Sequence, residues 1–208
     1  MTNKVITISR QFGSGGRSIG KAVAEKLGIP YYDKELVDKV AKESGFSHEF
    51  IEEIGEYASV TSSFLFNIAV SSHPMGLVDT MSVSDKLYVC QTNVIRDLAD
   101  KGPCVIVGRC ADVILKDYHP LNLFVYADKE AKIERCLRRA PAGEKLTRGD
   151  IERRMRQIDR GRAQYREMYA DSKWGAKETY HLCISTTEKY IKEIIPGLAA
   201  YVRCWFSE

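Results

Sequence analysis

A glycine-rich stretch near the start of the chain contains the residue types that bind phosphate. It reads FGSGGRS over residues 12–18 and follows the apolar run VITIS, which starts at Val5. A strand, a glycine-rich turn and a helix in this order place backbone N–H groups and a helix N-terminus around one point, which attracts an anion. The candidate phosphate ligands are Gly13, Ser14, Gly15, Gly16, Arg17 and Ser18, and the Ser18 hydroxyl is the candidate magnesium ligand.

This stretch departs from the common phosphate-loop motif G-x-x-x-x-G-K-[ST] at two positions. When Gly16, Arg17 and Ser18 are aligned with its last three positions, Gln11 replaces the first glycine and Arg17 replaces the lysine. A guanidinium is always charged and can hold two phosphate oxygens at once, whereas an ammonium is a compact charge that can follow a moving phosphoryl group. We therefore expect Arg17 to bind phosphate. A plain turn that only joins strand to helix is the alternative, and the dinucleotide motif G-x-G-x-x-G is not matched.

The segments that must position this loop alternate between strand and helix patterns. Near-continuous apolar runs, typical of strands that are covered on both faces, begin at Val5, Cys104, Leu121 and His181. Helical patterns lie between them, and together they predict a three-layer α/β domain with a parallel sheet and right-handed crossovers. Residues 45–83 fit this plan poorly, and we expect them to form a helical flap.

Several residues mark the expected helix ends. Gly28 is placed to end a helix after the loop, and a second helix is expected to start at Ser84 and stop at Gly102. Asp33 and Asp128 are expected N-caps of the helices that follow them. Thr147 and Asp150 match a capping box ahead of a long arginine-rich helix.

Composition limits the class of protein. The chain has 208 residues, 44% of them hydrophobic, which is enough for one core, so we expect a single domain. The 31 basic and 28 acidic residues nearly cancel, which argues against a nucleic-acid partner. The six cysteines have no metal-ligand spacing, and no apolar run reaches the length of a membrane span or a signal peptide. We expect a cytoplasmic protein with reduced thiols and no membrane partner.

The motifs together resemble one known family. ITISRQFGSGGRSIGKAVAEKLGIPYYDKELVDKVAKESG, VIVGRCADVIL, LFVYADKEAKIERCLRR, IDRGRAQYREMY and YHLCIST occur in this order over nearly the whole chain, and they are similar to the cytidylate kinase-like family of P-loop nucleoside monophosphate kinases. The resemblance implies a P-loop NTPase fold, ATP as phosphoryl donor, Mg²⁺, and a small acceptor, above all CMP or dCMP. It also implies that Arg17 takes the role of the lysine.

The resemblance implies roles for residues outside the loop. Asp33 and Arg109 are expected to bind the acceptor. Asp33 begins an acceptor-side helical flap that spans approximately residues 33–83, and Arg109 follows the third predicted strand. Cys110 stands where the family's GRD segment has aspartate, and Asp112 is a candidate substitute. An arginine-rich lid is expected over approximately residues 138–166. There Arg153, Arg156 and Arg160 share one helical stripe, and Arg160 and Arg162 are the candidate catalytic arginines.

Two alternatives remain open from the sequence. One is a kinase of the same fold that acts on another small molecule. The other is a nucleotide-responsive binding protein with little catalysis, which the departures at Gln11, Arg17 and Cys110 favour. The apolar residues 59–83 could serve a homodimer or a substrate flap equally well.

Overall fold

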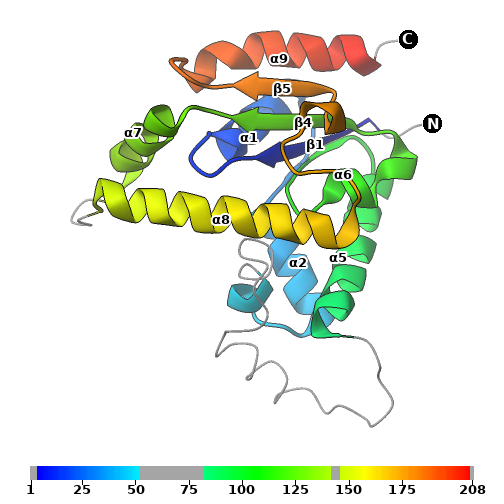
Figure 1. Cartoon of the computed structure of the whole chain (residues 1–208). Coiled ribbons are helices and arrows are strands. Elements are labelled where there is room, and N and C mark those ends of the chain that lie inside the picture. The colour runs from blue at the N-terminus through cyan, green and yellow to red at the C-terminus, as the bar shows by residue number, and fades with distance from the viewer. Residues whose placement is uncertain (1–3, 52–81, 142–145, 207–208) are drawn as a thin grey trace.

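A five-stranded parallel sheet forms the centre of the molecule (Figure 1). The computed structural model describes residues 4–51, 82–141 and 146–206. The strands are β1 (Val5–Arg10), β2 (Tyr31–Tyr32), β3 (Cys104–Val107), β4 (Leu121–Tyr126) and β5 (Leu182–Ser185), in the spatial order β2-β3-β1-β4-β5. Every pairing is parallel, so all five carboxyl ends lie at one edge, with β1 in the middle.

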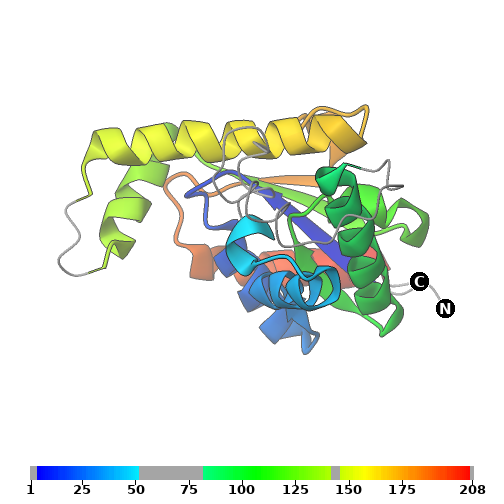
Figure 2. The ribbon, with the colours of Figure 1, turned by 90° about the horizontal axis from the view of Figure 1, so that it is seen from below.

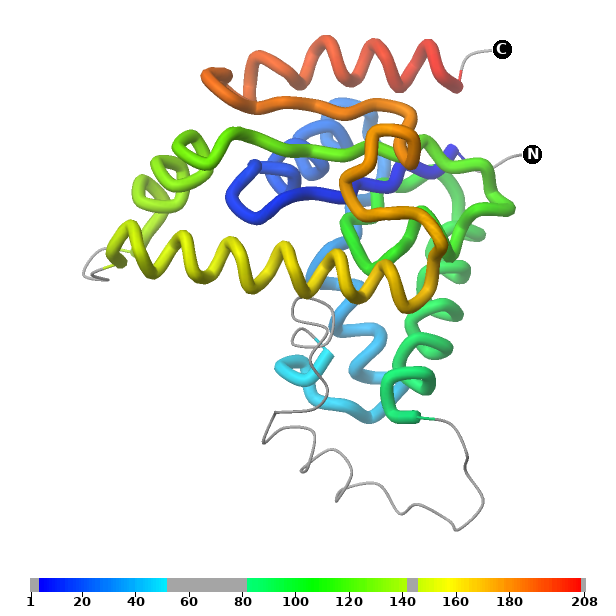
Figure 3. Tube along the Cα trace, in the orientation of Figure 1, coloured from blue at the N-terminus to red at the C-terminus, as the bar shows by residue number. Residues whose placement is uncertain are grey.

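Helices cover both faces of the sheet, as the sequence predicts (Figure 2). One face packs against α1 (Gly16–Leu27) and α9 (Ile191–Phe206). The other packs against α2 (Lys34–Ser44), α5 (Val83–Asp100), the short α6 (Ala111–Ile114) and part of α8 (Arg148–Tyr169). The remaining helix, α7 (Lys129–Arg139), lies beside the loop that follows β1 (Figure 3). Short 3-10 turns span Lys116–Tyr118 and Lys177–Thr179.

β1 is buried on both sides, although not all of its residues are apolar. Val5 packs into the core beneath α2 and α5, whereas Ile6 and Ile8 pack beneath α1 and α9. All six residues of the strand are buried. The hydroxyl of the buried Thr7 donates to Asn122 Oδ1 at 2.7 Å, and Ser9 and Arg10 are also buried. A strand between two helical layers is covered on both faces, which fits the near-continuous apolar run at its start.

Most of the predicted helix ends are confirmed. Gly28 ends α1 with φ 68°, and Thr147 and Asp150 form the capping box of α8. The helix expected from Ser84 instead begins at Val83, because Ser82 accepts a hydrogen bond from the Asp85 backbone N–H and caps it.

Asp33 and Asp128 occupy N-cap positions, but neither carboxylate makes a capping hydrogen bond. The carboxylate of Asp33 pairs with Arg17 instead. The sequence placed this aspartate correctly at the start of a helix but could not show the distant guanidinium that draws its side chain away.

The predicted flap and lid are described only in part. Of the flap, α2 and a helical segment at 48–51 are described, and residues 52–81, with nearly all of the apolar stretch 59–83, lie outside the described residues. Of the lid, the end of α7 and most of α8 are described, and 142–145 lie outside. None of the helices in the described ranges is both long enough and apolar enough to cross a membrane.

Candidate active site

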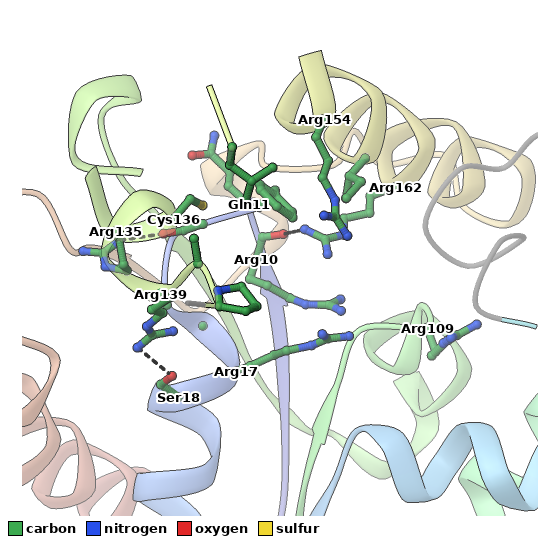
Figure 4. A pocket seen from close by; sticks show the side chains of 18 of the residues that line it. Arg10, Gln11, Arg17, Ser18, Arg109, Arg135, Cys136, Arg139, Arg154 and Arg162 are labelled. Atoms are coloured by element: carbon green, nitrogen blue, oxygen red, sulfur yellow. Dashed lines mark hydrogen bonds between the residues drawn. The ribbon is translucent and has the colours of Figure 1, made fainter. Parts of the chain in front are cut away.

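A cavity of about 670 Å³ lies at the carboxyl edge of the sheet, beside the end of β1 (Figure 4). Its walls come from the glycine-rich loop, the start of α1, the end of β3, α7 and α8. Among the described residues, Glu49 is the acidic residue in its lining, whereas seven arginines line it: Arg10, Arg17, Arg109, Arg135, Arg139, Arg154 and Arg162. So many guanidinium groups around one cavity favour a ligand with several negative charges.

The loop between β1 and α1 has the backbone of a phosphate cradle. Gly13 and Gly15 have φ of 72° and 86°, a left-handed conformation that favours glycine. A Cβ atom at Gly15 would lie 2.4 Å from Ile191 Cδ1, so a side chain there would require Ile191 to move. α1 begins directly after this turn, and its first-turn N–H groups and helix dipole face the cavity edge.

Buried polar side chains hold the loop from behind. Ser14 is buried and its hydroxyl donates to the Gln11 carbonyl at 2.8 Å. Thr186 Oγ1 donates to the Ser14 carbonyl at 2.7 Å, and Arg135 donates to the carbonyls of Gly13 and Thr186 at 2.7 and 3.0 Å. The carbonyls of the loop therefore bond to the protein and do not face an anion. Ser14 was expected to contact the phosphate, but its side chain holds the loop from behind. Thr186, at the end of the last predicted apolar run, does the same.

Gln11, which replaces a motif glycine, has a structural role. Its side-chain oxygen accepts hydrogen bonds from the Lys132 ammonium at 2.9 Å and from the Ala127 backbone N–H at 3.3 Å. Lys132 is buried on α7, and burial lowers the pKa of its ammonium below the ordinary value. The amide of Gln11 thus fastens the loop to α7.

Two residues expected on opposite sides of the site are in contact. Arg17 Nε lies 3.0 Å from the Asp33 carboxylate, with the arginine 51% exposed and the aspartate 12% exposed. Tyr31 Oη donates to the Arg17 carbonyl at 3.3 Å. Burial, reinforced by the Asp33 carboxylate, raises the pKa of the Tyr31 phenol above its usual range. Arg17 is therefore directed from the loop toward the start of α2, where Asp33 neutralises part of its charge.

Arg109 reaches the cavity from an unusual turn. Gly108, Arg109 and Cys110 all have positive φ, at 77°, 59° and 51°. Non-glycine residues hold this conformation only where their surroundings fix it, and here the buried Gln91 donates to the Arg109 carbonyl at 3.0 Å. The Arg109 guanidinium donates to the Ile51 carbonyl at 2.6 Å.

No carboxylate reaches this cavity from Cys110, which replaces the aspartate of the GRD segment, or from Asp112, the candidate substitute. Burial, with the nearby Asp112 charge, raises the pKa of the Cys110 thiol to about 12, so the thiol is neutral at ordinary pH. Asp112 pairs with Arg166, both side chains are 4% exposed, and neither lines the cavity. Asp112 therefore serves a buried ion pair.

The arginines of α8 divide between two stripes. Arg153 and Arg156 pair with Asp150 and Glu152 at 3.1 and 3.7 Å. Arg160, predicted as catalytic, is exposed and does not line the cavity. The stripe that lines the cavity consists of Arg154, Ile158 and Arg162.

Arg162 and Arg154 are both tied to the loop. Arg162 is buried and donates to the Arg10 carbonyl at 3.1 Å and to Asp159 at 3.3 Å. Asp159 also accepts a 2.7 Å hydrogen bond from the Phe12 backbone N–H, and the Arg154 guanidinium lies 5.7 Å from the centre of the Phe12 ring. The helical spacing of Arg154 and Arg162 from Ile158 is the signal that could have identified this stripe.

The remaining arginines of the lining, Arg10, Arg135 and Arg139, were not singled out from the sequence. Arg139 donates to the Ser18 hydroxyl at 3.3 Å, and both residues line the cavity. In the described part of the chain, no group of three or more His, Cys, Asp or Glu side chains could hold a metal ion. Mg²⁺ in kinases binds largely through substrate phosphates and needs few protein ligands, so the Ser18 hydroxyl is a suitable contact.

Comparisons with known structures show the same fold in kinases. A crystal structure of an uncharacterized protein from Eubacterium ventriosum ATCC 27560 is 29% identical, with a TM-score of 0.69 over 96% of this chain and 98% of that chain. Shikimate kinase from Acinetobacter baumannii in complex with shikimate is 14% identical, with a TM-score of 0.52 over 100% and 97%. A gluconokinase from Sinorhizobium meliloti 1021 is 15% identical, with a TM-score of 0.51 over 98% and 94%. These likenesses show the fold of P-loop kinases.

The sequence comparison is more specific. No curated protein matches the chain. The family model described as the cytidylate kinase-like family matches residues 5–188, which include the loop, the Arg109 turn and α8. The chain therefore belongs to the cytidylate kinase-like family of P-loop kinases.

Proposed function

We propose that the protein transfers the γ-phosphoryl group of ATP to a small phosphorylated acceptor, most specifically CMP or dCMP. The observation that carries this proposal is the single cavity in which a glycine-rich loop, a helix N-terminus and seven arginines converge at the carboxyl edge of the sheet. Ligands of open α/β sheets bind at this edge, and the charge suits two phosphorylated molecules together.

The residues divide into a donor side and an acceptor side. The loop backbone and the arginines on α7 and α8 face the donor phosphates. Asp33 and Arg109 stand on the acceptor side, where the guanidinium would hold the acceptor phosphate and the carboxylate would orient the acceptor and Arg17. Arg160 would join the site only through a movement of α8, since it is exposed in this conformation.

The arrangement is suited to loose phosphoryl transfer. Such a reaction needs positioning and charge neutralisation and no strong protein base. The fixed arginines lower the repulsion between donor and acceptor phosphates as they approach. Ser18 is the residue that would hold Mg²⁺, which neutralises charge on the β- and γ-phosphates when it is bound.

A panel of acceptors tests the proposal. The protein is incubated with ATP and Mg²⁺, and ADP release is measured with CMP, dCMP, UMP, AMP, shikimate or gluconate. We expect CMP or dCMP to accelerate ATP consumption and to yield the diphosphate, identified by mass spectrometry. Turnover with one of the other acceptors would replace the cytidylate assignment, whereas ATP binding without any product would favour a nucleotide-responsive binding protein.

A matched pair of variants tests the acceptor side. Arg109→Met should raise the acceptor KM by about tenfold or more while it leaves ATP affinity nearly unchanged, because it removes a charge-assisted hydrogen bond. Arg96→Met, an equivalent change at an exposed position of α5, is the control. Equal effects of the two changes on acceptor KM would contradict the role of Arg109.

A further inference from the structure

The side chain of Arg10 lies where a side chain at position 16, the start of α1, would otherwise lie. Arg10 is the last residue of β1 and is 9% exposed. A Cβ atom at Gly16, the first residue of α1, would lie 2.5 Å from Arg10 Cβ and 3.1 Å from Arg10 Cγ. The Arg10 stem therefore fills the direction in which a Gly16 side chain would have to leave the helix.

The other end of Arg10 has an equally restricted neighbour. A Cβ atom at Gly108, after β3, would lie 2.1 Å from Arg10 Nη1 and 3.0 Å from Arg10 Cζ. Two glycines thus border the side chain, one at its stem and one at its guanidinium. Figure 4 shows the Arg10 guanidinium between those of Arg17 and Arg162, and all three residues line the cavity.

This geometry gives the loop a second possible alignment. The eight-residue motif can start at Arg10 instead of Gln11, so that Gly15, Gly16 and Arg17 fall on its glycine, lysine and serine/threonine positions. Ser18, the expected magnesium contact, then lies one position beyond the motif. In this alignment the lysine position is the residue that opens the helix, and its side chain is absent because Arg10 stands there. The two alignments make different residues responsible for binding the donor.

From these contacts we infer that Arg10, and not Arg17, supplies the loop cation that binds the phosphates of ATP. The cation comes from the strand side of the loop, and Gly16 is glycine because this arginine needs its space. Arg17, half exposed and paired with Asp33, then serves the acceptor side. The inference rests on the proposed function, because it assumes that ATP is the donor.

The first test compares equal changes at three arginines. ATP affinity is measured by calorimetry without acceptor for the wild type, Arg10→Met, Arg17→Met and the surface control Arg96→Met. We expect Arg10→Met to weaken ATP binding about ten- to a hundredfold, the loss of a hydrogen bond between charged groups. Arg17→Met should change it by less than about fivefold, because the half-exposed Arg17 guanidinium pairs with Asp33 and, in this inference, does not bind the donor phosphates.

The second test moves the cation and does not depend on the fold tolerating Arg10→Met. Gly16→Lys alone should lose ATP binding, because the new side chain meets the Arg10 stem at 2.5 Å. In the double variant Arg10→Gly with Gly16→Lys that obstacle is gone, and the next neighbour is Val125 Cβ at 3.3 Å. We expect the double variant to bind ATP at least about tenfold more tightly than either Gly16→Lys or Arg10→Gly alone. Thermal melting confirms that each variant compared is folded.

The outcomes separate this inference from the proposed function. If the wild type and Arg10→Met bind ATP equally, or if Arg17→Met loses more affinity, the role of Arg10 is refuted and the kinase proposal stands. A double variant no better than its parents also refutes it. If ATP binding depends on Arg10 but no acceptor is phosphorylated, the inference stands and the transferase proposal falls. A wild type that binds no ATP refutes both.

Discussion

Removal of the Asp112 carboxylate should strongly destabilise the protein. Asp112 and Arg166 form an ion pair in which each side chain is 4% exposed. Arg166 also donates to the Ser172 carbonyl at 3.1 Å and to its hydroxyl at 2.9 Å, and its guanidinium lies 5.6 Å from the centre of the Tyr180 ring. Burial works against the charge of Arg166, but Asp112 and further neighbours outweigh it, so the pKa of Arg166 lies above its ordinary value.

The magnitude follows from the burial of the partner that remains. Asp112→Ala leaves a buried guanidinium without its carboxylate, which typically costs about 3–5 kcal/mol of unfolding free energy. For a chain of this size that corresponds to a fall in Tm of roughly 6–20 °C. The matched control is Glu178→Ala, because Glu178 and Lys177 pair at 3.8 Å with exposures of 71% and 86%. The control should cost less than about 1 kcal/mol.

Urea unfolding and thermal melting measure both variants. A third variant, Asp112→Leu with Arg166→Met, replaces the pair by apolar side chains of similar size and should recover most of the loss. If Asp112→Ala lowers the unfolding free energy no more than Glu178→Ala does, burial does not strengthen the contribution of the Asp112–Arg166 pair to stability. If the double replacement is as unstable as Asp112→Ala, the loss does not come from the uncompensated charge.

Two further predictions concern pH and thiol chemistry. Burial lowers the pKa of His181 below its ordinary 6.5, and its Nδ1 accepts a 2.9 Å hydrogen bond from the Asn122 backbone N–H. The unfolded chain therefore binds more protons at this site, so stability falls as pH drops through about 6.5, and Tm between pH 8 and pH 5.5 should fall more for the wild type than for His181→Asn. Cys204 is exposed, whereas Cys104 is buried and burial raises its pKa to about 12. Iodoacetamide at pH 8 should modify Cys204 much faster than Cys104 in the native protein, as followed by mass spectrometry of peptides, and equal rates would contradict the packing of Cys104.

Features set by local chemistry could be read from the sequence. The apolar run at Val5, the glycine turn at 13–16 and the capping box of Thr147 and Asp150 depend on neighbouring residues, and the structure confirms each one. The parallel sheet also follows from local patterns, because strands that are apolar on both sides need helices on both sides.

Features set by tertiary contacts could not be read in the same way. An arginine at the end of a strand or on a helix is ordinarily a solvated charge, so Arg10 and Arg135 gave no signal. Arg135 acts by holding Gly13 and Thr186, which lie 122 and 51 residues away in the chain. On α8 the family resemblance led to Arg160 and Arg162, of which Arg162 lines the cavity and Arg160 does not, because the apolar side chains of the helix decide which face turns inward.

The lysine that the glycine-rich loop lacks is accounted for by residues that are neighbours in space and not in sequence. Arg10 excludes a side chain at Gly16 and sits against Gly108, so these three positions form one steric unit. A lysine side chain at position 16 would overlap the Arg10 stem, so this chain cannot hold one there while Arg10 keeps its position. Arg17 is not part of this unit, and its Nε lies 3.0 Å from the Asp33 carboxylate. The absence of the usual lysine is then the steric consequence of a cation supplied from β1, and a loop with this arrangement keeps its positive charge while the sequence motif is broken.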